Sequence, residues 1–130
     1  MVVLLFDQSC KKAHIKRHYT GNFLFNVHYT STDANLNHSD TTYFYHGNIS
    51  IYNGKGTSEE ENKKLVFLTL SYAAGHGISE EILKDGHFVT DYYLRGEFSG
   101  AFSDDDNLSF SESNGGQGSS YSYTVTGTRE

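Results

Sequence analysis

One stretch of the sequence alternates between apolar and polar residues so regularly that it restricts the fold. Between Tyr19 and Thr30, every second residue is aromatic, apolar or glycine, and the residues between them are mostly polar. Side chains of a β-strand point alternately to the two faces of a sheet, so the pattern predicts a strand with one buried face. The same alternation returns between Thr42 and Tyr52. We therefore expect a fold built from half-buried strands.

The remaining sequence continues this pattern between polar turns. The segment 63–72 is apolar on both faces around Val66–Leu70, which predicts a central strand. The Asp-Gly pair in LKDGHF predicts a two-residue hairpin between a strand at 80–84 and another that starts at His87. Further strands are expected at 92–103, 108–113 and 121–129.

The predicted architecture is an all-β, antiparallel meander of seven to eight strands. A sheet of this size must curl or fold over to bury its apolar face, which gives a small sandwich or a partly closed barrel. The 130 residues suit a single β domain, expected at 19–130. Residues 1–18 are expected to form a signal-like segment and a basic tether, or else an extra N-terminal strand.

The first two predicted strands suggest a pairing that would bring two histidines together. Both contain the pattern Tyr-x-Gly-Asn, and a hairpin that pairs Phe25 with Ile49 places His28 opposite His46. Directly opposed Cβ atoms lie about 4.5–5.5 Å apart, close enough for two imidazoles to share a metal ion. A third ligand is not evident, so His28 and His46 are weak metal candidates, and solvent-facing histidines are the alternative.

Two other groups of residues are candidates for binding a ligand. The segment 103–107, SDDDN, clusters oxygen ligands for calcium, although Asp and Asn are also the residues that a hairpin turn requires. Four tyrosines suit stacking on sugars or on a partner protein, or packing within the sheet: Tyr92, Tyr93, Tyr121 and Tyr123.

The net charge and the short motifs of the sequence disfavour several classes of function. The formal charge is −6, which disfavours nucleic acid as a partner because phosphate recognition needs clustered Lys and Arg. The sequence has no nucleophile elbow, phosphate loop or dinucleotide fingerprint. We therefore expect a protein that is not an enzyme and needs no cofactor.

The single cysteine, Cys10, excludes an internal disulfide. It follows the apolar stretch VVLLF and precedes two lysines. Three roles are open for it: a small buried residue after an N-terminal strand, a reactive thiol, or a site of lipid attachment.

The sequence Ser9-Cys10-Lys11-Lys12 resembles the processing site of small envelope lipoproteins of the Bacteroidota. The resemblance implies lipid attachment at Cys10, an apolar signal segment before it and a polar tether after it. It also implies an anchored protein of the cell envelope, in the outer membrane and facing either the periplasm or the cell surface.

Two functions follow from these expectations. The first is a non-catalytic, lipid-anchored binding or accessory module of an outer-membrane complex, with another envelope protein as its partner. The alternative is a soluble, lipocalin-like β protein that binds a small ligand among inward-facing aromatic side chains.

Overall fold

The computed structural model describes residues 19–52, 66–93, 96–116 and 118–130. These residues form one antiparallel sheet in the order β4-β3-β2-β1-β8-β7-β6-β5. The strands are β1 (Gly21–Thr32), β2 (His38–Ile51), β3 (Phe67–Ala73), β4 (His76–Glu81), β5 (Asp91–Tyr93), β6 (Gly96–Asp104), β7 (Asn107–Gly116) and β8 (Ser119–Arg129).

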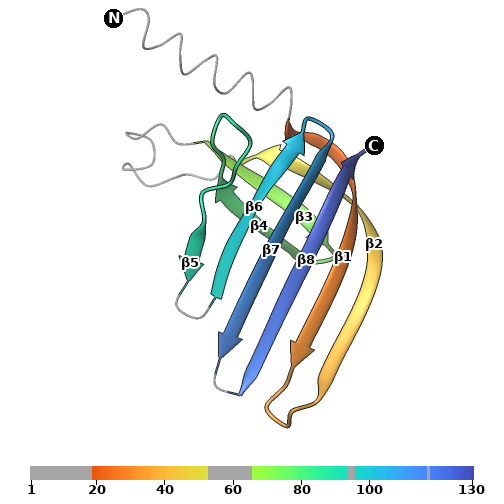
Figure 1. Cartoon of the computed structure of the whole chain (residues 1–130). Coiled ribbons are helices and arrows are strands. Elements are labelled where there is room, and N and C mark those ends of the chain that lie inside the picture. The colour runs from red at the N-terminus through yellow and green to blue at the C-terminus, as the bar shows by residue number, and fades with distance from the viewer. Residues whose placement is uncertain (1–18, 53–65, 94–95, 117) are drawn as a thin grey trace, which may run out of the picture.

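The sheet curls into a nearly closed barrel, with β3 and β4 facing β6–β8 across the interior (Figure 1). Strands that follow one another in the chain are neighbours, except β4 and β5, and the first strand pairs with the last. Two isolated bridges lie at the remaining gap, Ile82–Phe88 and His87–Ala101. The prediction of an all-β, partly closed barrel is therefore confirmed.

Two backbone hydrogen bonds define the loop of the hairpin at LKDGHF. The amide of Leu83 donates to the carbonyl of His87 at 2.8 Å, and the amide of Gly86 donates to the carbonyl of Leu83 at 3.0 Å. The loop thus has three residues rather than the two predicted. Its last residue, Gly86, has a φ of 94°, a conformation that glycine adopts without the steric cost of a Cβ atom.

The predicted register of β1 against β2 is wrong by four residues along β2. Phe25 pairs with Tyr45, not with Ile49. The cause is the tight loop 33–37, in which Asp33 and Asn37 are hydrogen bonded through both backbone and side chains. This loop extends the hairpin to the pair Thr32–His38. Since the shift is an even number of residues, every predicted inward residue still faces inward.

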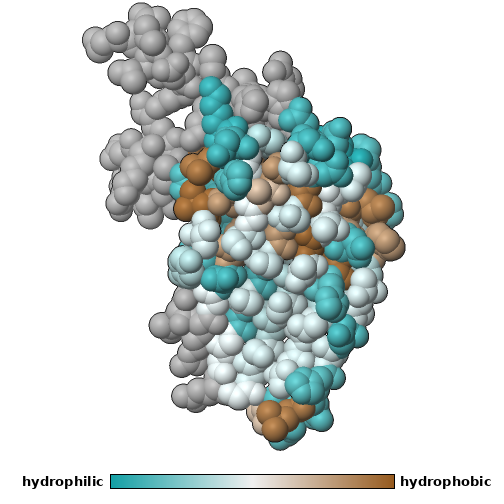
Figure 2. Space-filling view, in the orientation of Figure 1, coloured by the Kyte–Doolittle hydropathy of each residue, from teal (hydrophilic) through white to brown (hydrophobic). Residues whose placement is uncertain are grey.

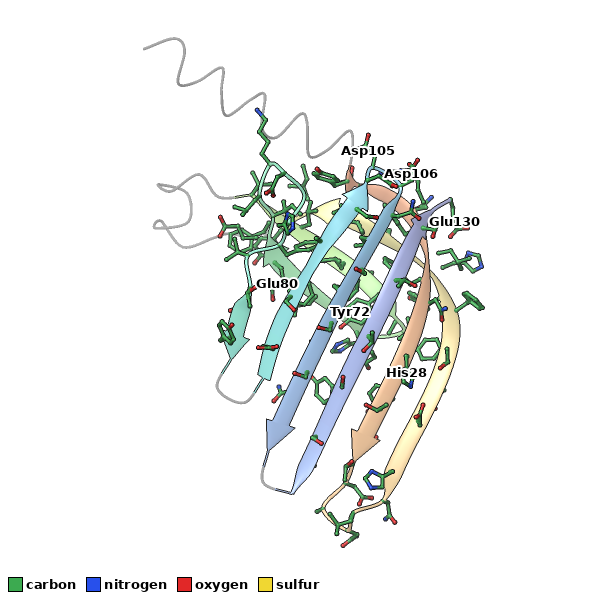
Figure 3. The ribbon with its side chains drawn as sticks, viewed as in Figure 1. His28, Tyr72, Glu80, Asp105, Asp106 and Glu130 are labelled. Carbon is green, nitrogen blue, oxygen red and sulfur yellow. The ribbon has the colours of Figure 1, made fainter. Side chains whose placement is uncertain are left out.

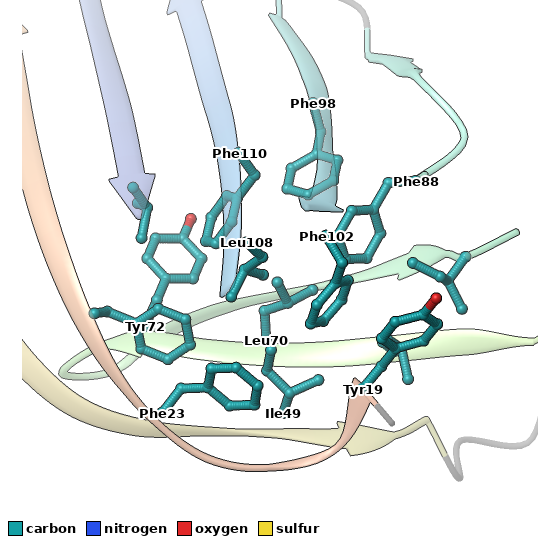
Figure 4. Packing of buried hydrophobic residues seen from close by; sticks show 14 of the residues in the cluster. Tyr19, Phe23, Ile49, Leu70, Tyr72, Phe88, Phe98, Phe102, Leu108 and Phe110 are labelled. Carbon is teal, nitrogen blue, oxygen red and sulfur yellow. The ribbon is translucent and has the colours of Figure 1, made fainter. Parts of the chain in front are cut away.

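The core consists mainly of aromatic rings from strands on opposite walls of the barrel (Figure 4). Phe25 is fully buried, and its ring contacts Tyr72 of β3 and Phe110 of β7 edge to face at 6.4 and 6.3 Å between centroids. Glycines on both neighbouring strands make room for it, because a Cβ atom at Gly47 or Gly127 would come within 2.9 Å of the Phe25 ring. Large and small residues thus alternate across the interior, as small barrels require.

The outer face over β6–β8 is polar and carries few apolar residues (Figure 2). Ser109, Thr124 and Thr126 are exposed there, while their neighbours Leu108, Phe110 and Val125 are buried. This contrast follows directly from the period-two alternation along each strand.

Replacing Phe25 with alanine should lower the free energy of unfolding by about 3–5 kcal/mol, because it removes the ring at the centre of the core. Phe44→Ala is the matched control, since Phe44 lies on the adjacent strand and is 69% exposed. Urea denaturation of both variants measures the difference. Equal losses in the two variants would show that the described interior is not the stabilising core.

Candidate functional site

One end of the barrel interior is left open because the strands have unequal lengths. β3 pairs only with Asn48–Ile51 of β2, although β2 begins at His38. The long strands β1, β2, β7 and β8 therefore extend beyond the β3–β4 hairpin (Figure 1). The inward side chains of these extensions line a concave surface that none of the described strands covers.

The concave surface holds a groove of about 430 Å³ between β1, β7 and β8. We call it the Tyr-lined groove. Its lining residues are Tyr29, Ser31, Thr32, Asp33, Asn114, Gly116, Ser119, Ser120 and Tyr121. Two aromatic rings and a set of hydroxyl and amide groups thus share a single concave surface.

A buried carboxyl group lies between the groove and the aromatic core. Glu112 is 4% exposed and faces inward from β7. The hydroxyl of Tyr72 donates a hydrogen bond to Glu112 Oε2, and His76 Nε2 lies 3.0 Å from the same oxygen. Both contacts offset the cost of burying the carboxyl group.

The β3–β4 hairpin positions both partners of Glu112. Its two-residue turn contains Gly75, whose φ is 68°, and places Tyr72 and His76 on either side. The pairing of β3 with β4 is irregular between Ser71 and Ala73, which changes the direction of the strand at Tyr72. Tyr72 projects into the interior behind β7 and β8 (Figure 3).

Aromatic stacking connects the Glu112 contacts to the groove. The ring of His76 stacks on that of Tyr123 with centroids 4.8 Å apart and an interplanar angle of 16°. Tyr123 in turn contacts Tyr29 at 4.8 Å and Tyr121 at 5.8 Å. We call Tyr72, His76, Glu112, Tyr121 and Tyr123 the Glu112 cluster. Tyr121 of this cluster lines the groove, and Tyr123 contacts the other lining tyrosine, Tyr29.

Burial within the cluster favours neutral tyrosines. It is the largest cause of the raised pKa of Tyr72, and the hydrogen bond and charge of Glu112 add to it. Burial followed by the charge of Glu112 raises the pKa of Tyr121. Burial also raises the pKa of Tyr123 to about 12. The rings beside the groove therefore stay uncharged at neutral pH.

The two predicted metal candidates do not meet. His28 lies opposite Thr42 and His46 opposite Leu24, because the register differs from the predicted one. His28 Nε2 is 2.7 Å from the Asp40 carboxylate, and His46 Nδ1 is 2.8 Å from that of Glu130. Within the described residues, no group of three or more His, Cys, Asp or Glu side chains is arranged to hold a metal ion.

The acidic segment 103–107 forms the β6–β7 turn. The Asp104 carboxylate accepts hydrogen bonds from the Asp106 amide at 2.8 Å and from the Asn107 side chain at 3.0 Å. Arg129 Nε donates to Asp106 at 3.0 Å. These oxygens hold the turn and the end of β8 together, which accounts for the Asp and Asn residues without a bound cation.

The four tyrosines expected to stack lie in different places. Tyr121 lines the groove and Tyr123 supports it, while Tyr92 is 74% exposed on β5. The side chain of Tyr93 lies outside the described residues.

Sequence reasoning missed Glu112 and His76, which are far apart in the chain. One signal was present, since Glu112 occupies an inward position in the alternation of β7, where an apolar residue is expected. His76 depends on the Ala74–Gly75 turn, which separates β3 from β4 and was not predicted.

The predicted lipid-attachment residue, Cys10, lies outside the described residues, as does the whole segment 1–18. In the portion of the chain that the structure describes, no helix has the length and apolar composition needed to cross a membrane.

The fold and the groove together define a small antiparallel β-barrel with one open, aromatic-lined end. No protein-family model matches the chain, and no curated protein or solved structure is significantly similar to it.

The raised tyrosine pKa values predict a loss of stability in alkali. The ordinary tyrosine pKa is 10.0, and that of Tyr123 in the folded chain is about 12. Between these values the unfolded chain loses a proton that the folded chain keeps, so the free energy of unfolding falls as the pH rises through this window. The stabilisation is complete below pH 10.

Urea denaturation at about pH 9 and about pH 11 measures this fall, and Tyr123→Phe should reduce it because phenylalanine does not ionise. Tyr92→Phe is the control, since Tyr92 is exposed. An unchanged alkaline fall in Tyr123→Phe would contradict the role given to Tyr123.

Proposed function

We propose that this protein is a non-catalytic binding protein and that its Tyr-lined groove takes a small ligand. The observation that carries the proposal is the groove itself, which has a volume of about 430 Å³ and lies at the open end of the barrel. Ligand sites usually measure about 300–1,000 Å³, and barrel mouths are a preferred place for them. The lining combines Tyr29 and Tyr121 with several hydroxyl and amide groups.

The Glu112 cluster supports binding rather than catalysis. A general acid or base must reach the substrate, whereas Glu112 is 4% exposed and accepts its hydrogen bonds from the protein. The ring of His76 stacks on Tyr123 and its Nε2 points at Glu112. These contacts hold the aromatic side chains beside the groove in fixed positions, which lowers the entropy cost of binding.

The filled core argues against a deep apolar cavity of the lipocalin kind. Aromatic rings fill the centre of the barrel, among them Phe98 of β6 and Phe110 of β7 (Figure 4), and the ring of Phe25 contacts that of Phe110. The ligand would therefore bind at the open end and remain partly in contact with water.

A lipid anchor at Cys10 is compatible with this geometry and is proposed separately. β1 begins at the end of the barrel opposite the groove (Figure 1). An anchor before Tyr19 would therefore join the chain at the end of the barrel opposite the groove. Membership of an outer-membrane complex, with an envelope protein as partner, stays a prediction that rests on the N-terminal resemblance.

A groove-filling substitution tests the binding proposal. Ser119 is an exposed inward residue of the groove, so Ser119→Trp should block binding without disturbing the core. Thr124→Trp is the control, since Thr124 is exposed on the outer face of the same strand. Saturation-transfer NMR measures binding to the original chain and to both variants, with a mixture of disaccharides, nucleosides, amino acids, a polyamine and a fatty acid as probes.

We expect at least one of these classes to bind the original chain and Thr124→Trp, and to lose binding in Ser119→Trp. A ligand that binds all three proteins equally would place the site elsewhere and overturn the proposal, and so would the absence of any bound class.

Intact mass spectrometry of the protein extracted from native membranes tests the anchor. A mature chain that starts at Cys10 and carries the mass of attached acyl chains is expected. A Cys10→Ala variant serves as the control and should remain unprocessed. Recovery of the original chain with residues 1–9 present and no added mass would refute lipid attachment.

A further inference from the structure

We infer that the ligand of the Tyr-lined groove is a neutral saccharide. This inference rests on the proposed function and adds the chemical class of the ligand. It is drawn from three properties of the groove: the support of its aromatic rings, the chemistry of its polar groups and its charge.

The two aromatic rings of the groove are held from behind. Tyr29 and Tyr121 line the groove, and both contact the ring of Tyr123, with centroids 4.8 and 5.8 Å away. Tyr123 stacks on His76, and His76 contacts the buried Glu112. Aromatic faces carry partial negative charge and attract partially positive hydrogen atoms. The C–H groups on one face of a pyranose ring present such hydrogens, so a fixed tyrosine platform suits a sugar.

The polar groups of the groove match sugar hydroxyls. Ser31, Asn114 and Ser119 project inward from β1, β7 and β8 around the two rings. A serine hydroxyl both donates and accepts hydrogen bonds, and an asparagine side chain offers two donor hydrogens and an acceptor oxygen. A sugar hydroxyl has the same dual character. Uncharged groups of this kind on three strands can therefore pair with a ring of hydroxyl groups.

The charge of the groove disfavours an anionic ligand. The lining residues that the structure describes include no Lys or Arg, and the chain has a net charge of −6. Asp33 is the acidic residue of the lining, and its carboxylate accepts hydrogen bonds from the amides of Asn35 and Asn37 and from the Asn37 side chain. These bonds lower its pKa and hold it within the β1–β2 loop. The Asp33 carboxylate therefore stays ionised at neutral pH and disfavours an anionic ligand, while the other polar groups of the lining are neutral.

Isothermal titration calorimetry with maltose, cellobiose and N,N′-diacetylchitobiose tests the inference, and spermidine serves as the cationic probe. We expect at least one disaccharide to bind the original chain. Tyr121→Ala should weaken this binding about tenfold or more, equivalent to about 1.4 kcal/mol, while Tyr121→Phe retains the aromatic face and should bind within about threefold. Tyr92→Ala is the control, because Tyr92 is exposed on β5.

Tyr121 also packs against Tyr123, so its removal can affect folding as well as binding. Ser119→Trp resolves this difficulty, because it fills the groove from an exposed position and should abolish disaccharide binding in a chain that keeps its melting temperature.

Taken together, the two experiments distinguish failure of the saccharide inference from failure of the proposed function. Disaccharide binding that is lost in Ser119→Trp supports both. If the NMR mixture yields a groove ligand while the disaccharides do not bind, the saccharide inference is overturned and the binding function stands. If spermidine binds in the groove and no disaccharide does, the saccharide inference is likewise overturned and the binding function stands. If no class binds, both are overturned.

Discussion

The fold depends on one constraint: a single sheet must bury its own apolar face. The eight antiparallel strands form one sheet, and no second layer covers it within the residues that the structure describes, so the sheet must curl until opposite walls meet. The contact between walls is made by aromatic rings, with Phe25 of β1 against Tyr72 of β3 and Phe110 of β7. Glycines beside Phe25 allow this contact, because a side chain at Gly47 or Gly127 would occupy the space of its ring.

Because the strands differ in length, the barrel has an open end beyond this core, and that end is the candidate binding site. Where β3 and β4 face the longer strands, the interior is filled mainly by apolar side chains, and beyond their hairpin the inward positions are open to water. Glu112 lies at the change between these two environments, with Tyr72 on the core side and His76 nearer the groove. A buried carboxyl group that has its donors fixes the aromatic rings around it more firmly than apolar contacts alone.

Much of the fold could be predicted because alternation is a local property of the sequence. The inward positions of β1 and β2 follow from a period of two and are correct even though their pairing is not, since Phe25 lies opposite Tyr45. That pairing depends on the hydrogen bonds of Asp33 in a loop whose geometry residue type alone does not specify. The pairing of His28 with His46 failed for the same reason.

Less of the candidate site could be predicted, because its parts come from strands that are distant in the chain. Tyr121 and Tyr123 were noted as aromatic residues in phase, but their neighbours Glu112 and His76 were not connected to them. The connection requires both the closure of the barrel and the turn at Gly75. Neither is visible as a short sequence motif.

We propose that the open end of the barrel is a binding surface and that the outer face is not. Two-dimensional amide NMR during titration with a ligand identified for this chain tests it most directly. Shifted resonances should cluster at residues 29–33, 114–116 and 119–121, which contain the lining of the groove. Shifts confined to exposed outer positions such as Ser109, Thr124 and Thr126 would contradict it.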